Sequence, residues 1–229
     1  MRIIVFGATG MVGQGVLREC LLDPGIARAL AVVRSPMGTH HEKLRELVVT
    51  DFLDFSPVEK ELAGYDACFF CLGVTSAGLG EDAYRRVTYD FTMAAATTLA
   101  GLNPGLTFVF VSGAGADSSE AGRVMWARIK GMTENAVLRL PFAASYVFRP
   151  AYIQPQHGIQ SRTRMYRVLY RVVAPLFPIL RALAPRHVTT TEQVGRAMIA
   201  VARRGAPKRV LENHDINEVE RQARAMPVA

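Results

Sequence analysis

The sequence predicts an α/β domain built on an open, doubly wound parallel sheet, with a small C-terminal lobe. The chain opens on an apolar run that ends in a glycine-rich turn. Strand-like and helix-like segments then alternate up to residue 150, which is typical of a parallel sheet. After residue 150 prolines and arginines dominate the segment up to residue 186. With 229 residues, 50% of them hydrophobic and 21% charged, the chain suits one domain with a sizeable core.

The first half of the chain divides into short buried strands and amphipathic helices. An uninterrupted apolar run indicates a strand that is covered on both faces. Asp23-Pro24-Gly25 ends the first helix, and Ser56, Pro57 and Glu59 are expected to cap the second, which Gly64 closes. The expected elements are strand 2–6, helix 11–22, strands 29–33, 47–49 and 66–72, and a helix from residue 56.

The second half continues the alternation and then changes character. The expected elements are helix 81–100, strand 107–111, helix 123–140 and strand 145–148. A cap at 190–193 begins a further helix that ends before Gly205, a short strand follows at 210–211, and Asp215 with Glu218 caps the last helix. We expect one domain over 1–229, in which 151–229 contributes a lobe over the carboxyl ends of the strands, where open α/β sheets bind ligands.

The glycine-rich turn predicts a dinucleotide site of the Rossmann type. Gly7 permits the sharp turn from strand to helix, Gly10 lets the backbone approach a diphosphate, and Gly13 lets the helix pack closely on the strand. The unpaired N–H groups of the helix N-terminus attract phosphate. The expected contacts within the turn are Gly7, Thr9, Gly10, Met11, Val12 and Gly13.

The end of the second strand indicates which dinucleotide binds. A site for NAD usually offers an acidic side chain there, whereas this chain has Val33-Arg34-Ser35. A guanidinium can pair with a 2′-phosphate and stack on adenine, so we expect NADP(H) to be preferred over NAD(H). The remaining expected contacts are Asp51 and Phe52 at the adenine and Leu72, Gly73, Val74 and Thr75 beside the middle of the cofactor.

The three cysteines fit a reducing compartment and no metal site. Cys68 and Cys71 have the spacing of a redox or metal motif, but residues three apart on a strand point to opposite faces. We therefore interpret them, with Cys20, as small buried hydrophobic residues.

The net charge of +7 is unevenly distributed. Residues 156–211 carry eleven arginines or lysines and one acid, a net +10, which leaves −3 for the rest of the chain. No nucleic-acid motif accompanies this basic segment, so we expect no nucleic-acid partner. The apolar stretch 165–184 contains three arginines and two prolines, which argues against a spanning helix. This stretch can form a lid, a dimer face or a membrane-surface contact, and the sequence does not decide among them. We expect a cytoplasmic protein.

Several segments together resemble the atypical short-chain dehydrogenase/reductases, and among them the Tat-interactive oxidoreductase-like group. The resemblance extends over nearly the whole chain. It implies an NADPH-binding fold with a Ser-Tyr-Lys active site, in which Ser112 matches the serine, Lys130 matches the lysine and also contacts the cofactor, and Pro150 borders the cofactor. The segments that carry it are Gly7-Ala8-Thr9-Gly10, Cys71-Leu72-Gly73-Val74-Thr75, Val87-Thr88-Tyr89-Asp90, Val111-Ser112, Lys130-Gly131, Phe148-Arg149-Pro150 and Leu211-Glu212-Asn213.

One position departs from the pattern of this family. Trp126 stands four residues before Lys130, where the family has its tyrosine. A tyrosine donates the proton that a carbonyl oxygen needs after hydride transfer, whereas an indole N–H has no accessible proton to release. Loss of a general acid costs about 10²–10⁴-fold in rate, so slow reduction can survive.

Three rescues of the missing role stay open: Tyr152 after the sixth strand, Tyr89 on the long helix, or Lys130 or a water acting directly. The departure favours a cofactor-binding or redox-sensing protein with weak or no catalysis. The retained Ser112 and Lys130 favour the alternative, an NADPH-dependent reductase of a small carbonyl compound. An epimerase or dehydratase of sugar nucleotides is less favoured, because it needs the same tyrosine. The sequence specifies no substrate, reaction direction, oligomeric state or protein partner.

Overall fold

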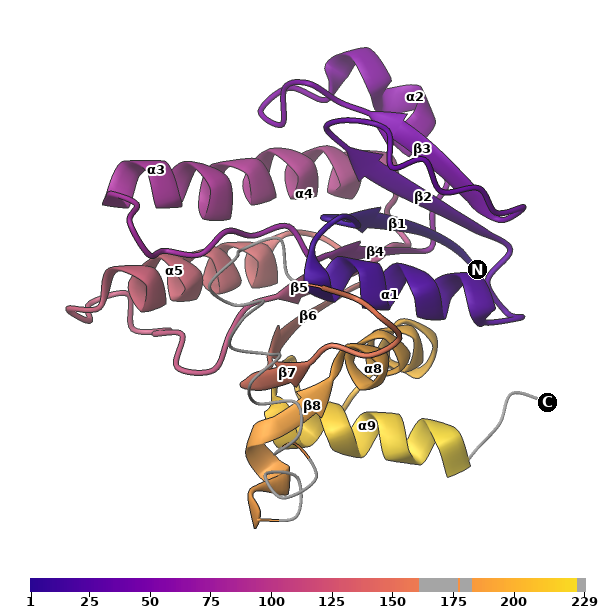
Figure 1. Cartoon of the computed structure of the whole chain (residues 1–229). Helices are drawn as coiled ribbons and strands as arrows, with labels where there is room; N and C mark the ends of the chain where they lie inside the picture. Colours follow the sequence, from indigo (N-terminus) through magenta and orange to yellow (C-terminus); the bar gives the residue numbers. More distant parts are fainter. Residues whose placement is uncertain (161–176, 178–182, 226–229) are drawn as a thin grey trace.

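A seven-stranded parallel sheet forms the centre of the molecule (Figure 1). The computed structural model describes residues 1–160, 177 and 183–225. The strand order is β3-β2-β1-β4-β5-β6-β9, and each neighbouring pair is parallel. The prediction of a doubly wound α/β sheet is therefore confirmed, and the order reverses direction between β1 and β4, where such sheets bind ligands.

The elements follow the order expected from the sequence. Along the chain they are β1 (Arg2–Phe6), α1 (Met11–Leu22), β2 (Arg28–Val33), β3 (Leu44–Val48), η1 (Ser56–Val58), α2 (Glu59–Leu62), β4 (Ala67–Phe70), α3 (Glu81–Arg85), the π-helical turn η2 (Arg86–Asp90), α4 (Phe91–Leu102), β5 (Thr107–Val111), α5 (Met125–Arg139), β6 (Ala144–Arg149), β7 (Tyr152–Gln154), η4 (Pro185–His187), β8 (Val188–Thr190), α8 (Thr191–Arg204), β9 (Val210–Glu212) and α9 (Asn213–Ala225).

Helices cover both faces of the sheet, so the strands are apolar on both sides (Figure 1). One core lies between the sheet and α1, α8 and α9, and contains Val109 and Phe69. The other lies between the sheet and α2, α4 and α5, and contains Phe70, Phe108 and Phe110. Successive residues of β5 thus alternate between the two cores.

Several boundaries differ from the sequence-based prediction. The expected helix 81–100 is divided into α3, η2 and α4, and the expected strand 66–72 is shorter. The third strand covers Leu44–Val48 rather than 47–49. Ser56 does not cap a helix: its amide is bonded to the Asp54 carboxylate at 2.9 Å, and only a 3₁₀ turn and four α-helical residues follow. This local turn of Asp54 competes with the capping geometry. The last helix begins at Asn213, so Asp215 lies within its first turn rather than before it. The Asp215 carboxylate accepts the Glu212 amide at 3.1 Å.

The residues after 150 are shared between two sheets. β9 adds a seventh strand to the main sheet, while β7 and β8 form a separate two-stranded parallel sheet. The cap of α8 is as predicted, since the Thr190 hydroxyl accepts the Gln193 amide at 3.0 Å and Gly205 ends the helix. Most of the segment 165–184 lies outside the described residues. Among the helices that are described, none has the length and apolar character needed to cross a membrane.

Two glycines let α1 and α8 approach closely. A Cβ added at Gly15 of α1 would lie 2.6 Å from the Cβ of Thr191, and one at Gly195 of α8 would lie 2.9 Å from the Cγ of Glu19. The helix that begins at the glycine-rich turn is therefore fixed against the C-terminal part of the chain by backbone contact.

This contact predicts the effect of a methyl group. Gly15→Ala should lower the free energy of unfolding by about 1–3 kcal/mol, because the new Cβ forces α1 and α8 apart. Gly101→Ala on α4 is the matched control: an added Cβ there meets nothing within 4 Å, so stability should stay the same or rise by about 0.4–1 kcal/mol. Urea unfolding of the two variants measures the difference, and equal stabilities would contradict the close packing.

Candidate functional site

The glycine-rich turn adopts the geometry that a dinucleotide site requires. Gly7 has a φ of 74°, and a Cβ there would lie 2.6 Å from the Cys71 carbonyl carbon and the Leu72 nitrogen. A Cβ at Gly13 would lie 2.0 Å from the Gly7 carbonyl oxygen. The Gly10 amide donates to the same oxygen at 2.9 Å, and α1 begins at the next residue. The free N–H groups of α1 are thus aimed over the end of β1.

A cavity of 360 Å³ lies in front of this turn, at the carboxyl ends of the central strands. Ten residues that the sequence predicts to contact the cofactor line it, and they come from β1–α1 and from the segments after β2, β3 and β4. Cys71, Val87 of η2 and Phe91 of α4 also line it and were not predicted as contacts. The i, i+4 spacing of Val87 and Phe91 on one helix face was the available signal for these two. The lining residues are Gly7, Thr9, Gly10, Met11, Arg34, Phe52, Cys71, Leu72, Gly73, Val74, Thr75, Val87 and Phe91.

The adenine end of this cavity combines an exposed cation with a buried ring. Arg34 is exposed and forms no ion pair within the described part of the chain, so its donors are available to a ligand. Phe52 is buried against Phe6, Phe55 and Phe91. Asp51 is exposed and accepts the Leu53 amide at 2.9 Å, and it does not line the cavity.

The other predicted contacts support the cavity without lining it. Gly13 packs beneath the turn, and Val12 packs on the core that includes α8. Pro150 is buried, and its carbonyl accepts the Ala114 amide at 2.9 Å. Gly73, by contrast, lines the cavity, and an added Cβ there would meet nothing within 4 Å.

The three cysteines are free thiols in apolar surroundings. Burial raises the pKa of Cys71, which lines the cavity, and raises the pKa values of Cys20 and Cys68 well above their usual range. A thiol with a raised pKa is a poor nucleophile and metal ligand.

The family positions on α5 form one stripe along the helix. Trp126, Lys130 and Glu134 are spaced four residues apart, so they share a face. The Trp126 ring lies beside the loop after β5, since a Cβ added at Gly115 would be 3.5 Å from its Cη2 atom. The structure thus places an indole one helical turn before Lys130 on the same face of α5.

Ser112 directly follows β5, and its hydroxyl is engaged by a carboxylate of α5. Its hydroxyl donates to the buried Glu134 carboxylate. Arg149 also binds this carboxylate, with Nε–Oε1 at 3.0 Å and Nη2–Oε2 at 2.5 Å. Arg149 also donates to the Ser118 hydroxyl at 2.6 Å and to the Glu212 carboxylate at 3.2 Å. The hydroxyl of Ser112 is therefore bonded to a buried ion pair, which was not predicted from the sequence. The available signal was Arg149, a charged residue at the end of an apolar strand.

Lys130 has no carboxylate partner within the described residues. Its Nζ atom donates to the Val111 carbonyl at 3.2 Å and lies 4.9 Å from the centroid of the Phe110 ring. Burial lowers the pKa of Lys130 to about 8, and the charge of Glu134 opposes this shift without cancelling it. Val111 ends β5, the neighbour of β4.

The two alternative tyrosines point to other partners. The Tyr152 hydroxyl donates to Gln154 at 2.7 Å, and burial raises the pKa of this tyrosine. Tyr89 lies two residues after Val87, so it projects from nearly the opposite face of the helix, and Arg85 lies 5.2 Å from the centroid of its ring.

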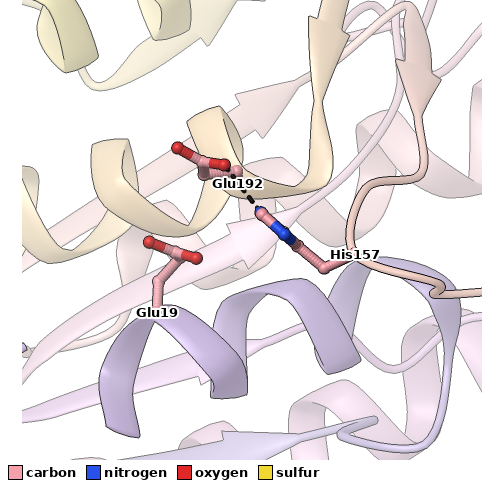
Figure 2. Close-up of side chains that lie close together, drawn as sticks. All are labelled: Glu19, His157 and Glu192. Atoms are coloured by element: carbon pink, nitrogen blue, oxygen red, sulfur yellow. Dashed lines mark hydrogen bonds and ion pairs between the residues drawn. The ribbon is translucent and has the colours of Figure 1, made fainter. Parts of the chain in front are cut away.

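Three side chains where α1 meets α8 form a cluster with metal-binding potential. Ligand atoms of Glu19, His157 and Glu192 are within 4.8 Å of one another (Figure 2). Arg196, however, binds Glu19 at 2.9 Å and Glu192 at 2.8 Å, and His157 bonds to the second oxygen of Glu192 at 2.8 Å. Burial alone would raise the pKa of Glu192, but the His157 hydrogen bond and the Arg196 charge hold it below its usual value. The carboxylates are thus already neutralised by cations, which favours an ion-pair network over a metal.

This network predicts that zinc has no effect on stability. The thermal unfolding midpoint in a millimolar excess of Zn²⁺ should equal the midpoint in EDTA, because a divalent cation would have to displace Arg196. A saturable rise that disappears in His157→Ala would instead identify a metal site.

Comparisons with known proteins agree with this geometry. Residues 7–144 match the model of a family described as NAD(P)H-binding. Protein HTATIP2 of Rattus norvegicus is 29% identical over 154 residues, which is 66% of this chain and 62%, less than two thirds, of the rat protein. The mitochondrial protein fmp52-2 of Aspergillus oryzae is 26% identical over 222 residues, 93% of each chain. Because this relative is named mitochondrial, the cytoplasmic location stays an expectation.

Solved structures show the same fold. The Bordetella bronchiseptica enzyme WbmF, solved in complex with NAD⁺, superposes with a TM-score of 0.65 at 16% identity over 98% of this chain and 78% of its own. A UDP-N-acetylglucosamine 4-epimerase from Methanobrevibacter ruminantium gives 0.67 at 15% identity over 91% and 74%. With the glycine turn, the cavity and these matches, the resemblance to atypical short-chain dehydrogenase/reductases is confirmed, and the chain belongs to the NAD(P)H-binding family.

Proposed function

We propose that this protein binds NADPH in the cavity at the β1–α1 turn and serves chiefly as a cofactor-binding, redox-sensing protein with slow chemistry of its own. The observation that carries the choice of NADPH is the guanidinium of Arg34 on the cavity wall, which is exposed and forms no ion pair with any residue that the structure describes. No acidic side chain lines this cavity to receive the ribose hydroxyls that NAD would present.

Two features of the site support slow chemistry. The position of the family's phenol holds Trp126, whose indole cannot act as an acid. The hydroxyl of Ser112 is bonded to Glu134, which is itself held by Arg149. A group committed to a buried ion pair is not free to orient a substrate oxygen.

NADPH binding is tested by calorimetry on the wild type and three variants. Arg34→Ala should weaken NADPH about 10- to 100-fold, the loss expected for a charged, bidentate contact, and leave NADH nearly unchanged. Arg28→Ala, at the opposite end of β2, is the matched control and should bind normally. Gly73→Leu should fill the cavity and abolish binding without lowering the unfolding temperature. Absence of NADPH binding by the wild type would overturn the proposal.

A second candidate function is reduction of a small carbonyl compound by NADPH. The observation that favours it is Lys130, a lysine with a pKa of about 8 at the end of β5, because a scaffold has no need of a lysine with a lowered pKa.

Trp126→Tyr distinguishes the two functions. If the site lacks only its acid, this variant should oxidise NADPH with 4-nitrobenzaldehyde about 10²-fold faster than the wild type, or more. Trp126→Phe removes the indole without supplying an acid and is the control. Equal rates in the wild type and Trp126→Tyr would show that a phenol on this stripe is not what the reaction lacks.

A further inference from the structure

We propose that Lys130 itself donates the proton in the slow carbonyl reduction of this site, in place of the phenol that Trp126 replaces. The inference rests on the proposed binding of NADPH. It assigns to one side chain the role that the family divides between a tyrosine and a lysine.

Lys130 lies where the reacting end of the cofactor is expected. The diphosphate belongs on the turn after β1, and Arg34 places the adenosine half toward β2. The other half must then extend the opposite way, over the end of β4, where Leu72 and Gly73 line the cavity. The next strand is β5, and its last residue, Val111, holds the Lys130 Nζ atom at 3.2 Å.

The ion pair behind Lys130 keeps its amine free of a counter-ion. Glu134 is one turn away on the same face and would be the natural partner. Both oxygens of this carboxylate are bound by Arg149, and Ser112 donates to it as well. Lys130 is left with a carbonyl oxygen and the face of Phe110. An ammonium without a paired carboxylate in such a place loses its proton more readily, which agrees with its pKa of about 8.

The other candidate donors are excluded by their contacts. Ser112 donates its hydroxyl hydrogen to Glu134. Tyr152 donates to Gln154, and its pKa is raised rather than lowered. Tyr89 projects away from the face that Val87 and Phe91 present to the cavity. Cys71 lines the cavity, but burial raises the pKa of its thiol. Lys130 does not itself line the cavity, but its pKa of about 8 is matched to proton transfer near neutral pH.

The proposed step balances with groups already named. NADPH, when bound, supplies a hydride to the carbonyl carbon. The electron pair of the broken C=O π bond moves to oxygen, which takes a proton from Nζ of the Lys130 ammonium. The product is an alcohol and a neutral amine. Lys130 is partly exposed, so water can reprotonate it before the next turnover.

The first experiment measures the amine without any turnover. Trace acetylation with acetic anhydride from pH 6 to 11, followed by peptide mass spectrometry, reports the neutral fraction of each lysine. The chain has four, so Lys43, Lys60 and Lys208 are internal controls. Labelling of Lys130 should be half-maximal at a pH of about 8. A midpoint near 10.4, the value of an unperturbed lysine, would overturn the proposal.

The second experiment separates proton donation from cofactor binding. The rate of 4-nitrobenzaldehyde reduction by the wild type should fall as the pH rises through about 8, because the donor must be protonated. Lys130→Arg keeps the charge and the hydrogen bonds but cannot release a proton, since the pKa of arginine exceeds 12. It should bind NADPH like the wild type and reduce the aldehyde about 10²-fold more slowly. Lys60→Arg, on the exposed surface, is the matched control.

The outcomes identify which statement fails. Unchanged turnover in Lys130→Arg, or no turnover by wild type that binds NADPH, overturns the role of Lys130 and leaves cofactor binding intact. Failure of the wild type to bind NADPH in the calorimetric titration overturns both.

Discussion

The contact between Gly13 and the carbonyl of Gly7 is the constraint on which the rest of the structure depends. A side chain at Gly13 would place its Cβ 2.0 Å from that oxygen, so only glycine lets α1 begin directly over the end of β1. This fixes where the free N–H groups of α1 point, and with them the place of a phosphate. The same helix is held from behind by α8, where Gly15 and Gly195 remove the side chains that would separate the two axes. The C-terminal part of the chain therefore buttresses the turn rather than forming a separate body.

A second constraint is the buried ion pair between Glu134 of α5 and Arg149 of β6. Glu134 is almost fully buried, and an unpaired carboxylate there would be very costly. Arg149 and Ser112 satisfy it, and a backbone contact keeps the neighbouring loop in place, since a Cβ at Gly131 would lie 1.7 Å from the Asp117 carbonyl oxygen. This arrangement has a chemical consequence. Arg149 and Ser112 occupy the Glu134 carboxylate, and no carboxylate of the described residues forms an ion pair with the amine of Lys130, which bonds to the Val111 carbonyl instead.

The sequence predicts best where the requirement is local. A positive φ at Gly7, the close approach at Gly13 and an arginine after a buried strand are properties of single positions, and the cavity contains most of the residues predicted from them. The sequence predicts less well the contacts of a side chain whose partner is distant along the chain. Ser112 matches a family serine by position, but its hydroxyl goes to Glu134, 22 residues on, and Arg149 is a further 15 residues away. Ser56 was also predicted wrongly, although its partner is only two residues away. The bond from its amide to Asp54 replaces the helix cap that a serine before a proline indicates.

The cavity and the stripe of Trp126 and Lys130 belong to different elements of this fold, so a change of side chain in the stripe need not alter the cavity. The turn after β1 and the segments after β2, β3 and β4 line the cavity, whereas the proton transfer that we propose involves α5. Trp126 is only partly buried, beside the loop that holds Gly115, and supports none of the cavity-forming contacts. An exchange of phenol for indole there leaves the cavity wall untouched and changes only which group can release a proton. Lys130 lies one turn further along the same helix face, so in our proposal the rate of carbonyl reduction depends on how readily this one amine gives up its proton.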